Sequence, residues 1–154
     1  MVTRFKDFSE LKKAVEAFIV YALYATAQEI YDIIQSKIDE YYAEYKPWKY
    51  IRTGELDNAL QKTDPVKKGN CYTCTVGFED DYLTFQYPGN PDWDKNIPAT
   101  GADVLYYFNN KSHGGTVKGK HKYWDEAINE INARYGSIQG LFREKLNEVS
   151  VPIK

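Results

Sequence analysis

Two cysteines and two histidines are the residues best suited to hold a metal ion in this sequence. Cys71 and Cys74 form a Cys-x-x-Cys pair, and His113 and His121 follow with seven residues between them. Structural zinc sites usually place about three to five residues between their histidines. The cysteines lie in strand-like sequence, where residues three apart point to opposite faces, so the two sulfurs would be separated. A redox pair would need its first cysteine at the start of a helix. We therefore predict structural free thiols, at least one of them buried, and no bound metal.

Acidic residues gather in two segments, 79–81 and 92–94, where carboxylates could pair or bind a cation. Both segments lie between apolar runs, which is typical of solvated loops. The sequence has no EF-hand spacing, P-loop, nucleophile elbow or zinc-protease motif. A small enzyme, such as a nuclease or a toxin component, stays an alternative. Its site would use His113, His121, Asp92 and Asp94.

The composition is that of a globular protein of 154 residues, with 43% hydrophobic and 27% charged residues. Twenty basic against 22 acidic residues leave a net charge of −2, which argues against a dedicated nucleic-acid binder. There is neither a secretory signal nor an apolar run of the ~20 residues that a membrane span needs. We expect one intracellular domain over residues 1–154, without membrane anchor or cofactor. The 14 tyrosines suit an interaction surface.

The first third of the chain has helical periodicity, because apolar residues recur every three or four positions from residue 11 to residue 45. Asp7 and Glu10 form a capping box that predicts the helix start, and Pro47 predicts its end. Such a helix would be about 55–60 Å long. We therefore expect either a break near residues 26–28 or an end that packs on another subunit.

The middle of the chain predicts a short helix followed by a β-hairpin. Thr53 is the expected N-cap of the helix, and Leu56 lies on its apolar side. β-Branched and aromatic residues in segments 71–78 and 82–87 predict two strands, and the acidic segment 79–81 predicts their turn.

The last third predicts helices separated by long loops. Proline and glycine favour loops over 88–101 and 112–121, while segment 102–110 favours a helix over a third strand. Helical periodicity returns from Trp124, and Gly136 predicts a kink or two shorter helices. The expected fold class is α+β: a long N-terminal helix and a C-terminal helix packed on a small antiparallel sheet, with long loops.

The most specific motif lies in residues 41–60, YYAEYKPWKYIRTGELDNAL. It resembles the Tyr-x-Pro-x-x-Tyr-x-Arg-Thr-Gly-x-Leu pattern of the head–tail joining (neck or tail-completion) proteins of long-tailed bacteriophages and Gram-positive prophages. The matching residues are Tyr45, Pro47, Tyr50, Arg52, Thr53, Gly54 and Leu56. The run His113-Gly114-Gly115 is similar to a Gly-x-His-Gly-Gly stretch of some members, although Asn110 or Lys111 stands where they carry glycine.

The resemblance implies a non-catalytic virion assembly protein. Its partners would be other neck, connector or tail proteins and further copies of itself in a ring. A ring in the virion is compatible with a monomer when the protein is free. It would act in the host cytoplasm during assembly and then in the virion. Tyr21, Tyr24 and Tyr31 do not all fit the main helical stripe, which favours a second contact surface. An adaptor that binds a single partner is the other alternative.

Overall fold

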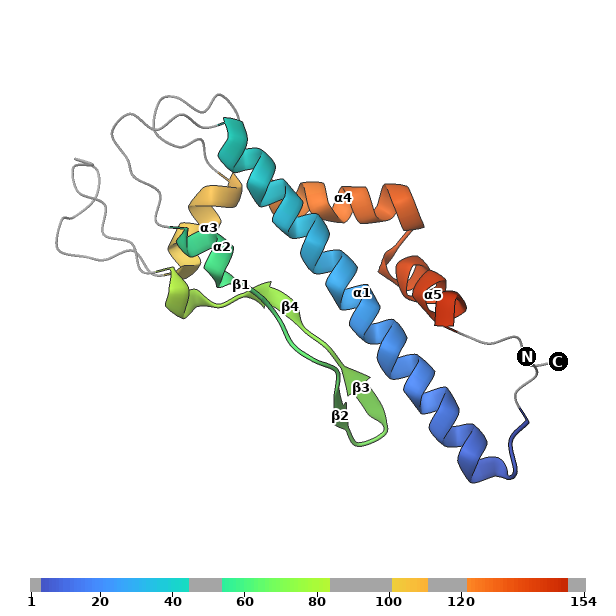
Figure 1. Ribbon diagram of the computed structural model, residues 1–154. Helices are drawn as coiled ribbons and strands as arrows, with labels where there is room; N and C mark the ends of the chain where they lie inside the picture. The colour runs from blue at the N-terminus through green and yellow to red at the C-terminus, as the bar shows by residue number, and fades with distance from the viewer. Residues whose placement is uncertain (1–3, 45–53, 84–100, 111–121, 150–154) are drawn as a thin grey trace, which may run out of the picture.

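The computed structural model describes residues 4–44, 54–83, 101–110 and 122–149. Its elements are α1 (Phe8–Glu44), α2 (Glu55–Ala59), β1 (Leu60–Lys62), β2 (Val66–Lys68), β3 (Cys71–Thr73), β4 (Val76–Phe78), the 3-10 helix η1 (Asp80–Tyr82), α3 (Gly101–Asn110), α4 (Tyr123–Tyr135) and α5 (Ile138–Val149). Helix α1 lies in the middle of the molecule, with α4 and α5 along one side and the hairpin along the other (Figure 1). This is the predicted α+β class, and segment 101–110 is the predicted helix.

Helix α1 begins at the predicted capping box. The Glu10 amide donates to Asp7 Oδ1 at 2.9 Å, while Glu10 Oε2 accepts from the Lys6 amide at 2.7 Å. The helix runs for 37 residues without interruption, about 55 Å at 1.5 Å per residue. The alternative of a break near residues 26–28 is therefore wrong. The Thr26 hydroxyl donates to the Ala22 carbonyl at 2.7 Å, which satisfies this buried polar group inside the helix.

The β-hairpin lies earlier in the chain than predicted. Strand β1 pairs antiparallel with β4, and β2 pairs antiparallel with β3, so that Leu60 faces Phe78 and Lys68 faces Cys71. Gly69 turns the chain with a φ of 62°, a conformation that costs glycine little. Between the two ladders, the Thr63 amide donates to the Thr75 carbonyl at 2.9 Å and keeps the strands in line.

The predicted hairpin turn at segment 79–81 is wrong, and residues 84–87 of the second predicted strand lie outside the described residues. The acidic segment 79–81 leads into η1 instead of forming a hairpin turn, and the Glu79 amide donates to the Ala59 carbonyl at 2.9 Å. Segment 71–78 pairs instead with the residues that precede it. The observed turn at residues 69–70 suits a two-residue hairpin connection, because Gly69 adopts a left-handed conformation there.

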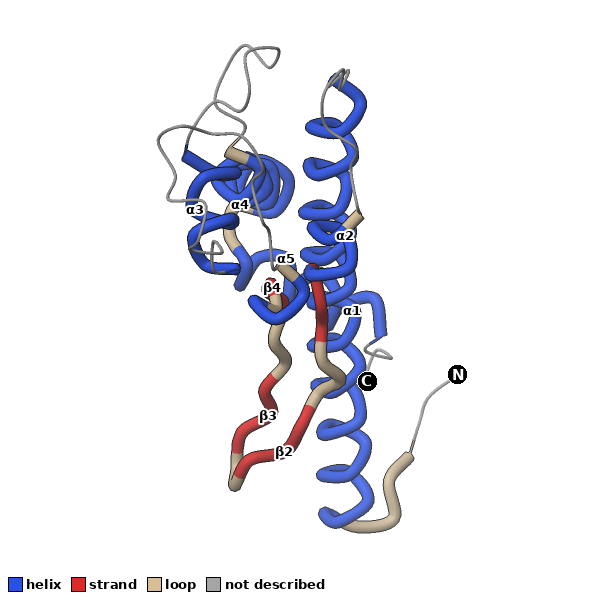
Figure 2. The backbone as a smooth tube through the Cα atoms, turned by 90° about the vertical axis from the view of Figure 1, so that its left-hand side faces the viewer, coloured by secondary structure: helices blue, strands red, loops and turns tan. Residues whose placement is uncertain are grey.

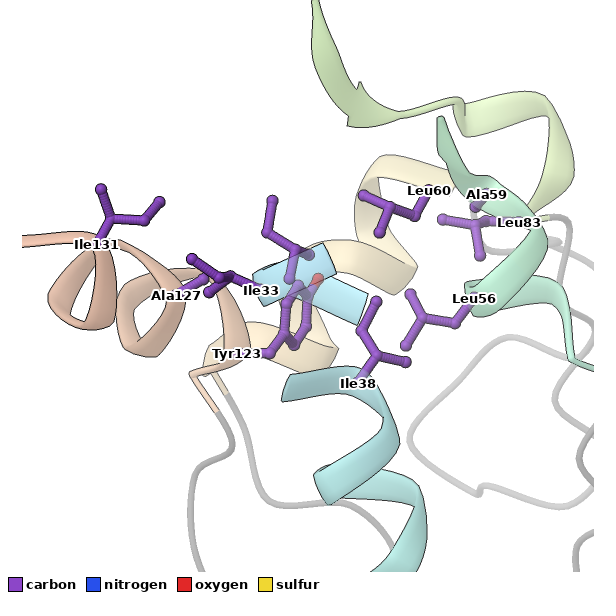
Figure 3. Close-up of a cluster of buried hydrophobic side chains, with 10 residues drawn as sticks. Ile33, Ile38, Leu56, Ala59, Leu60, Leu83, Tyr123, Ala127 and Ile131 are labelled. Atoms are coloured by element: carbon purple, nitrogen blue, oxygen red, sulfur yellow. The ribbon is translucent and has the colours of Figure 1, made fainter. Parts of the chain in front are cut away.

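The main core lies where α1 meets α2, β1 and α4. Figure 3 shows Ile33 and Ile38 of α1 between Leu56 of α2 and the α4 side chains. The Phe78 ring meets the Tyr123 ring edge-on at 5.6 Å, which joins β4 to α4. The ten buried residues of this cluster are Ile33, Ile34, Ile38, Leu56, Ala59, Leu60, Leu83, Tyr123, Ala127 and Ile131. Burying each of the larger aliphatic side chains contributes about 1.5–3 kcal/mol.

The C-terminal helical region is divided in two at Gly136, as predicted. Gly136 has a φ of 75°, and its amide donates to the Asn132 carbonyl at 2.9 Å, which ends α4. Ser137 then caps α5 by accepting from the Gly140 amide at 3.0 Å. The second helix turns back along α1 and buries Leu141 against it. In the part of the chain that the structure describes, no helix combines the length and the apolarity needed to cross a membrane.

Candidate interaction surface

The described part of the Tyr/Pro/Arg-Thr-Gly motif is the start of α2. Gly54 has a φ of 76° and is the N-cap, with its carbonyl accepting from the Asn58 amide at 3.1 Å. The prediction that Thr53 is the N-cap is therefore wrong. A left-handed residue turns the chain into the helix here, and β-branched residues avoid that conformation. No side-chain hydrogen bond caps α2.

The motif also anchors α2 to α1. Leu56 is 2% exposed and packs in the main core beside Ile38 (Figure 3). Next to it, Gln35 Nε2 of α1 donates to Asp57 Oδ1 at 3.1 Å. Leu56 thus has a structural role and is not a surface contact. The predicted helix end at Pro47 and eight candidate residues lie outside the described residues: Tyr45, Pro47, Tyr50, Arg52, Thr53, His113, Gly114 and Gly115.

The two cysteines lie on the hairpin. Cys71 is exposed and Cys74 is partly buried, so the prediction that at least one is buried is wrong. The reason is that the two-stranded sheet of β2 and β3 lies at the tip of the hairpin beside α1 (Figure 2), and its residues are mostly exposed. Cys74 Sγ donates to the Thr63 carbonyl at 2.7 Å. Within the described ranges, no three histidine, cysteine or acidic side chains gather as metal ligands would.

The candidate residues of the alternative enzyme site all lie outside the described residues: His113, His121, Asp92 and Asp94. The described members of the first acidic segment, Glu79 and Asp81, are solvent-exposed at the far end of β4. Their side chains therefore lie at the surface.

Titratable groups do gather between α1 and the C-terminal helices, where sequence reasoning did not place them. Glu29 of α1 accepts a hydrogen bond from the Tyr135 hydroxyl at 2.9 Å. Arg134 and Lys145 approach the same carboxylate at 3.7 and 3.8 Å. Burial and the Glu29 hydrogen bond raise the pKa of Tyr135. One carboxylate therefore holds both α4 and α5 on α1.

A second ionic group lies about two turns further along α1. Lys37 Nζ is 2.9 Å from Glu130 Oε2 and 3.0 Å from Glu40 Oε1. Glu130 also contacts Arg134, so the two groups are continuous. The hydrogen bond from Lys37 lowers the pKa of Glu130, and hydrogen bonds to both carboxylates raise the pKa of Lys37. Both shifts favour the charged forms of Lys37 and Glu130, which fits a role in helix packing. In the sequence, the only sign of this ionic group is the four-residue spacing of Glu130 and Arg134.

The three tyrosines that do not all fit the main helical stripe of α1 have different environments. Tyr21 is exposed, whereas Tyr31 packs against the core cluster. The Tyr24 ring is partly exposed and lies under Lys62 Nζ, 4.3 Å from the ring centroid. The hairpin thus covers part of this face of α1, and Tyr21 stays at the surface.

The start of α1 carries an apolar row, which we call the α1 strip: Phe8, Leu11, Val15 and Phe18. Phe8 is 79% and Val15 is 41% exposed, whereas Leu11 and Phe18 are partly buried. Ala22, the next residue of the same row, is fully buried. The change follows the position of α5, which lies beside the middle of α1 and not beside its first turns (Figure 1). The α1 strip is therefore an apolar surface at one end of the molecule.

Residues 7–148 match the sequence profile of the YomN family. The chain belongs to the YomN family. That family derives from Bacillus phages and prophages, so the sequence resemblance to phage proteins is supported at this level. No curated protein and no solved structure matches the chain. The stretch that matches the YomN family begins at the α1 cap and ends in the last turn of α5, and so includes every element described above.

Proposed function

We propose that this YomN-family protein is a non-catalytic virion assembly protein of the phage head–tail junction. In this role it joins the connector to the tail as a subunit of a homo-oligomeric ring. The observation that carries the proposal is the match of nearly the whole chain to a phage and prophage family, in a chain that also has the Tyr/Pro/Arg-Thr-Gly motif. The protein acts in the host cytoplasm during assembly and afterwards in the virion.

The architecture supports an assembly role. Helix α1 is long for a domain of this size, and its first turns extend beyond α5 (Figure 1). The motif begins where α1 ends and leads into α2, whose Leu56 is held in the core. A partner that binds the motif would therefore bind a segment joined directly to α1 and to α2.

A ring also needs two different contact faces on each subunit, because its interfaces are heterologous. Large side chains are exposed at both ends of the molecule. Tyr82, Tyr106 and Trp124 are exposed on η1, α3 and α4, elements that lie towards one end of the molecule (Figure 1). Val66 is exposed on β2, which lies towards the other end, and Tyr21 is exposed on α1. Tyrosine and tryptophan supply large contact areas with little loss of side-chain entropy.

A deletion of this gene in an inducible prophage tests the proposal. We expect filled heads and separate tails that do not join, with normal particles restored by the wild-type gene supplied in trans. Electron microscopy of the lysate and plaque titre measure both outcomes. Normal infectious particles from the deletion strain contradict the head–tail role. A turnover activity that is lost in His113→Ala would favour the enzyme alternative instead.

A further inference from the structure

The β-hairpin consists of two parts that are attached to the rest of the molecule in different ways. Its root, β1 and β4, is held by apolar packing: Leu60 is 1% exposed, and Val76 and Phe78 pack against the core cluster. Its tip, β2 and β3 with the turn between them, lies beside α1 (Figure 2). Most side chains of the tip are exposed, and the core cluster of the described residues includes none of them. Apolar packing therefore fixes the root and leaves the tip to polar contacts.

An irregular joint separates the tip from the root, because β1–β4 and β2–β3 are two separate ladders. At the joint, Thr63 Oγ1 accepts from the Thr75 amide at 3.0 Å, and the Thr63 carbonyl accepts from the Cys74 thiol at 2.7 Å. Pro65, two residues further on, has no amide hydrogen to donate. Segments with exposed hydrogen bonds and little apolar burial move at a low cost in free energy. The joint thus keeps the two strands together and allows the tip to change its angle to the root.

An ionic contact joins the tip to α1. Lys67 Nζ of β2 lies 3.1 Å from Glu16 Oε1 of α1, and 5.2 Å from the centroid of the Tyr72 ring in β3. We call these three residues the latch. The charged and titratable groups that face Glu16 are Lys67, Tyr72 and, from α1 itself, Lys12. The hydrogen bond from Lys67 lowers the pKa of Glu16, and the same bond raises the pKa of Lys67.

We propose that the hairpin tip is a movable arm that the latch holds closed against α1. With the ion pair intact, the tip lies along α1. When the pair is lost, the tip moves away about the joint at Thr63 while the root stays in the core. Exposed ion pairs are weak and are screened by salt, so the closed and open arrangements are close in free energy. This conformational device goes beyond the proposed function and does not depend on it.

Opening changes the charged surface at this end of the molecule. It frees the Lys67 ammonium beside the exposed Lys68 and uncovers the Glu16 carboxylate. The folded pKa of Glu16 is below its unfolded value of about 4.3, so the latch is complete above that pH and is lost as the pH falls through the folded pKa. At neutral pH, salt opens the arm by screening the pair.

The distance between the tip and α1 tests the proposal. The exposed Cys71 thiol is a native attachment point on the tip, and Ser9→Cys supplies a second point at an exposed position of α1. Both carry spin labels in a Cys74→Ser background, and double electron–electron resonance at pH 7 measures their separation. We expect one short distance at low salt and an added longer one at about 1 M salt, where the screening length is only about 3 Å.

Variants of the latch identify the contact responsible. Glu16→Gln should lower the ratio of closed to open molecules at least ~2-fold at low salt and make it insensitive to salt. Glu144→Gln removes an exposed carboxylate from α5 and is the matched control, which should leave the ratio unchanged. Glu16→Lys and Lys67→Glu should each open the arm, and the two together should close it again. Circular dichroism should show the wild-type spectrum for every variant, since each change is at the surface.

A second label pair tests that the root stays fixed. Labels at Ser9→Cys and Gln61→Cys, in a Cys71→Ser/Cys74→Ser background, should keep one distance at every salt concentration and in every latch variant. Movement of the root together with the tip contradicts the proposal. So does a tip distance that is the same in the wild type and in Glu16→Gln at both salt concentrations. Failure of the charge exchange to close the arm also overturns it, because the ion pair would then not be the latch.

Discussion

The Lys37 ammonium of α1 lies 2.9 Å from a carboxylate oxygen of Glu130 in α4. Both side chains are largely shielded from solvent, and the pair joins α1 to α4 beside the main core. Tyr123, Ala127 and Ile131 of α4 are buried in the core that α4 shares with α1. The ion pair thus lies beside the apolar face that α4 buries.

The Glu130 contact predicts an acid-sensitive contribution to stability. The pKa of Glu130 is lower in the folded protein than its unfolded value of about 4.3, so its contribution is complete above that pH. It is lost as the pH falls through the folded pKa. We expect Glu130→Gln to reduce the free energy of unfolding by about 1 kcal/mol at pH 7, and by less near pH 3. Urea unfolding of both proteins across this range measures the difference. A difference that is independent of pH would contradict the assignment.

The conformation of Gly54 predicts a cost of substitution that comes from the backbone alone. No atom lies within 4 Å of a Cβ built at Gly54 or at Gly77, but only Gly54 has a positive φ, of 76°. Gly54→Ala should lower the free energy of unfolding by about 1–2 kcal/mol. Gly77→Ala is the matched control and should stay within about 0.5 kcal/mol of the wild type. Denaturant midpoints measured side by side test this, and equal midpoints would refute it.

The Tyr135 hydroxyl predicts a specific role for one oxygen atom in joining α4 to α1. Tyr135→Phe removes the 2.9 Å hydrogen bond to Glu29 and keeps the ring, so it should cost about 1 kcal/mol. Tyr21→Phe removes a hydroxyl from an exposed tyrosine and should have no measurable effect. Thermal melting of the two variants distinguishes them. If both melt with the wild type, the hydrogen bond does not contribute to stability.

The hairpin thiols should differ in their reactivity. Cys71 is exposed, whereas the Cys74 thiol is partly buried and donates to the Thr63 carbonyl. With a chromogenic disulfide reagent we expect two phases under native conditions, the faster one from Cys71. Cys71→Ser should abolish the fast phase and leave the slow one.

Elemental analysis of protein purified without chelator should find no stoichiometric zinc. One tightly held zinc per chain, lost in Cys71→Ser, would contradict the prediction that the thiols are structural.

The helices could be predicted from local signals in the sequence. Apolar residues at three- and four-residue spacings and the Asp7–Glu10 cap define α1, and segment 102–110 was predicted as the helix that became α3. Gly136 was predicted as a break because glycine is costly inside a helix, and it separates α4 from α5. These features are local: each depends on the propensities and periodicity of neighbouring residues, which the sequence states directly.

The partners of these elements could not be predicted, because they depend on contacts between distant residues. Strand β2 consists of Val66, Lys67 and Lys68, a mostly polar segment with no strand signal, and it became a strand because its neighbour across a two-residue turn supplied the hydrogen bonds. The contact between Glu29 and Tyr135 joins residues 106 positions apart, and no local pattern encodes it. The exposure of the α1 strip also depends on the tertiary structure. Periodicity marks Phe8 and Val15 as apolar positions of a helix, but the point where α5 ends decides that they lie uncovered, because burial is a property of the assembled helices.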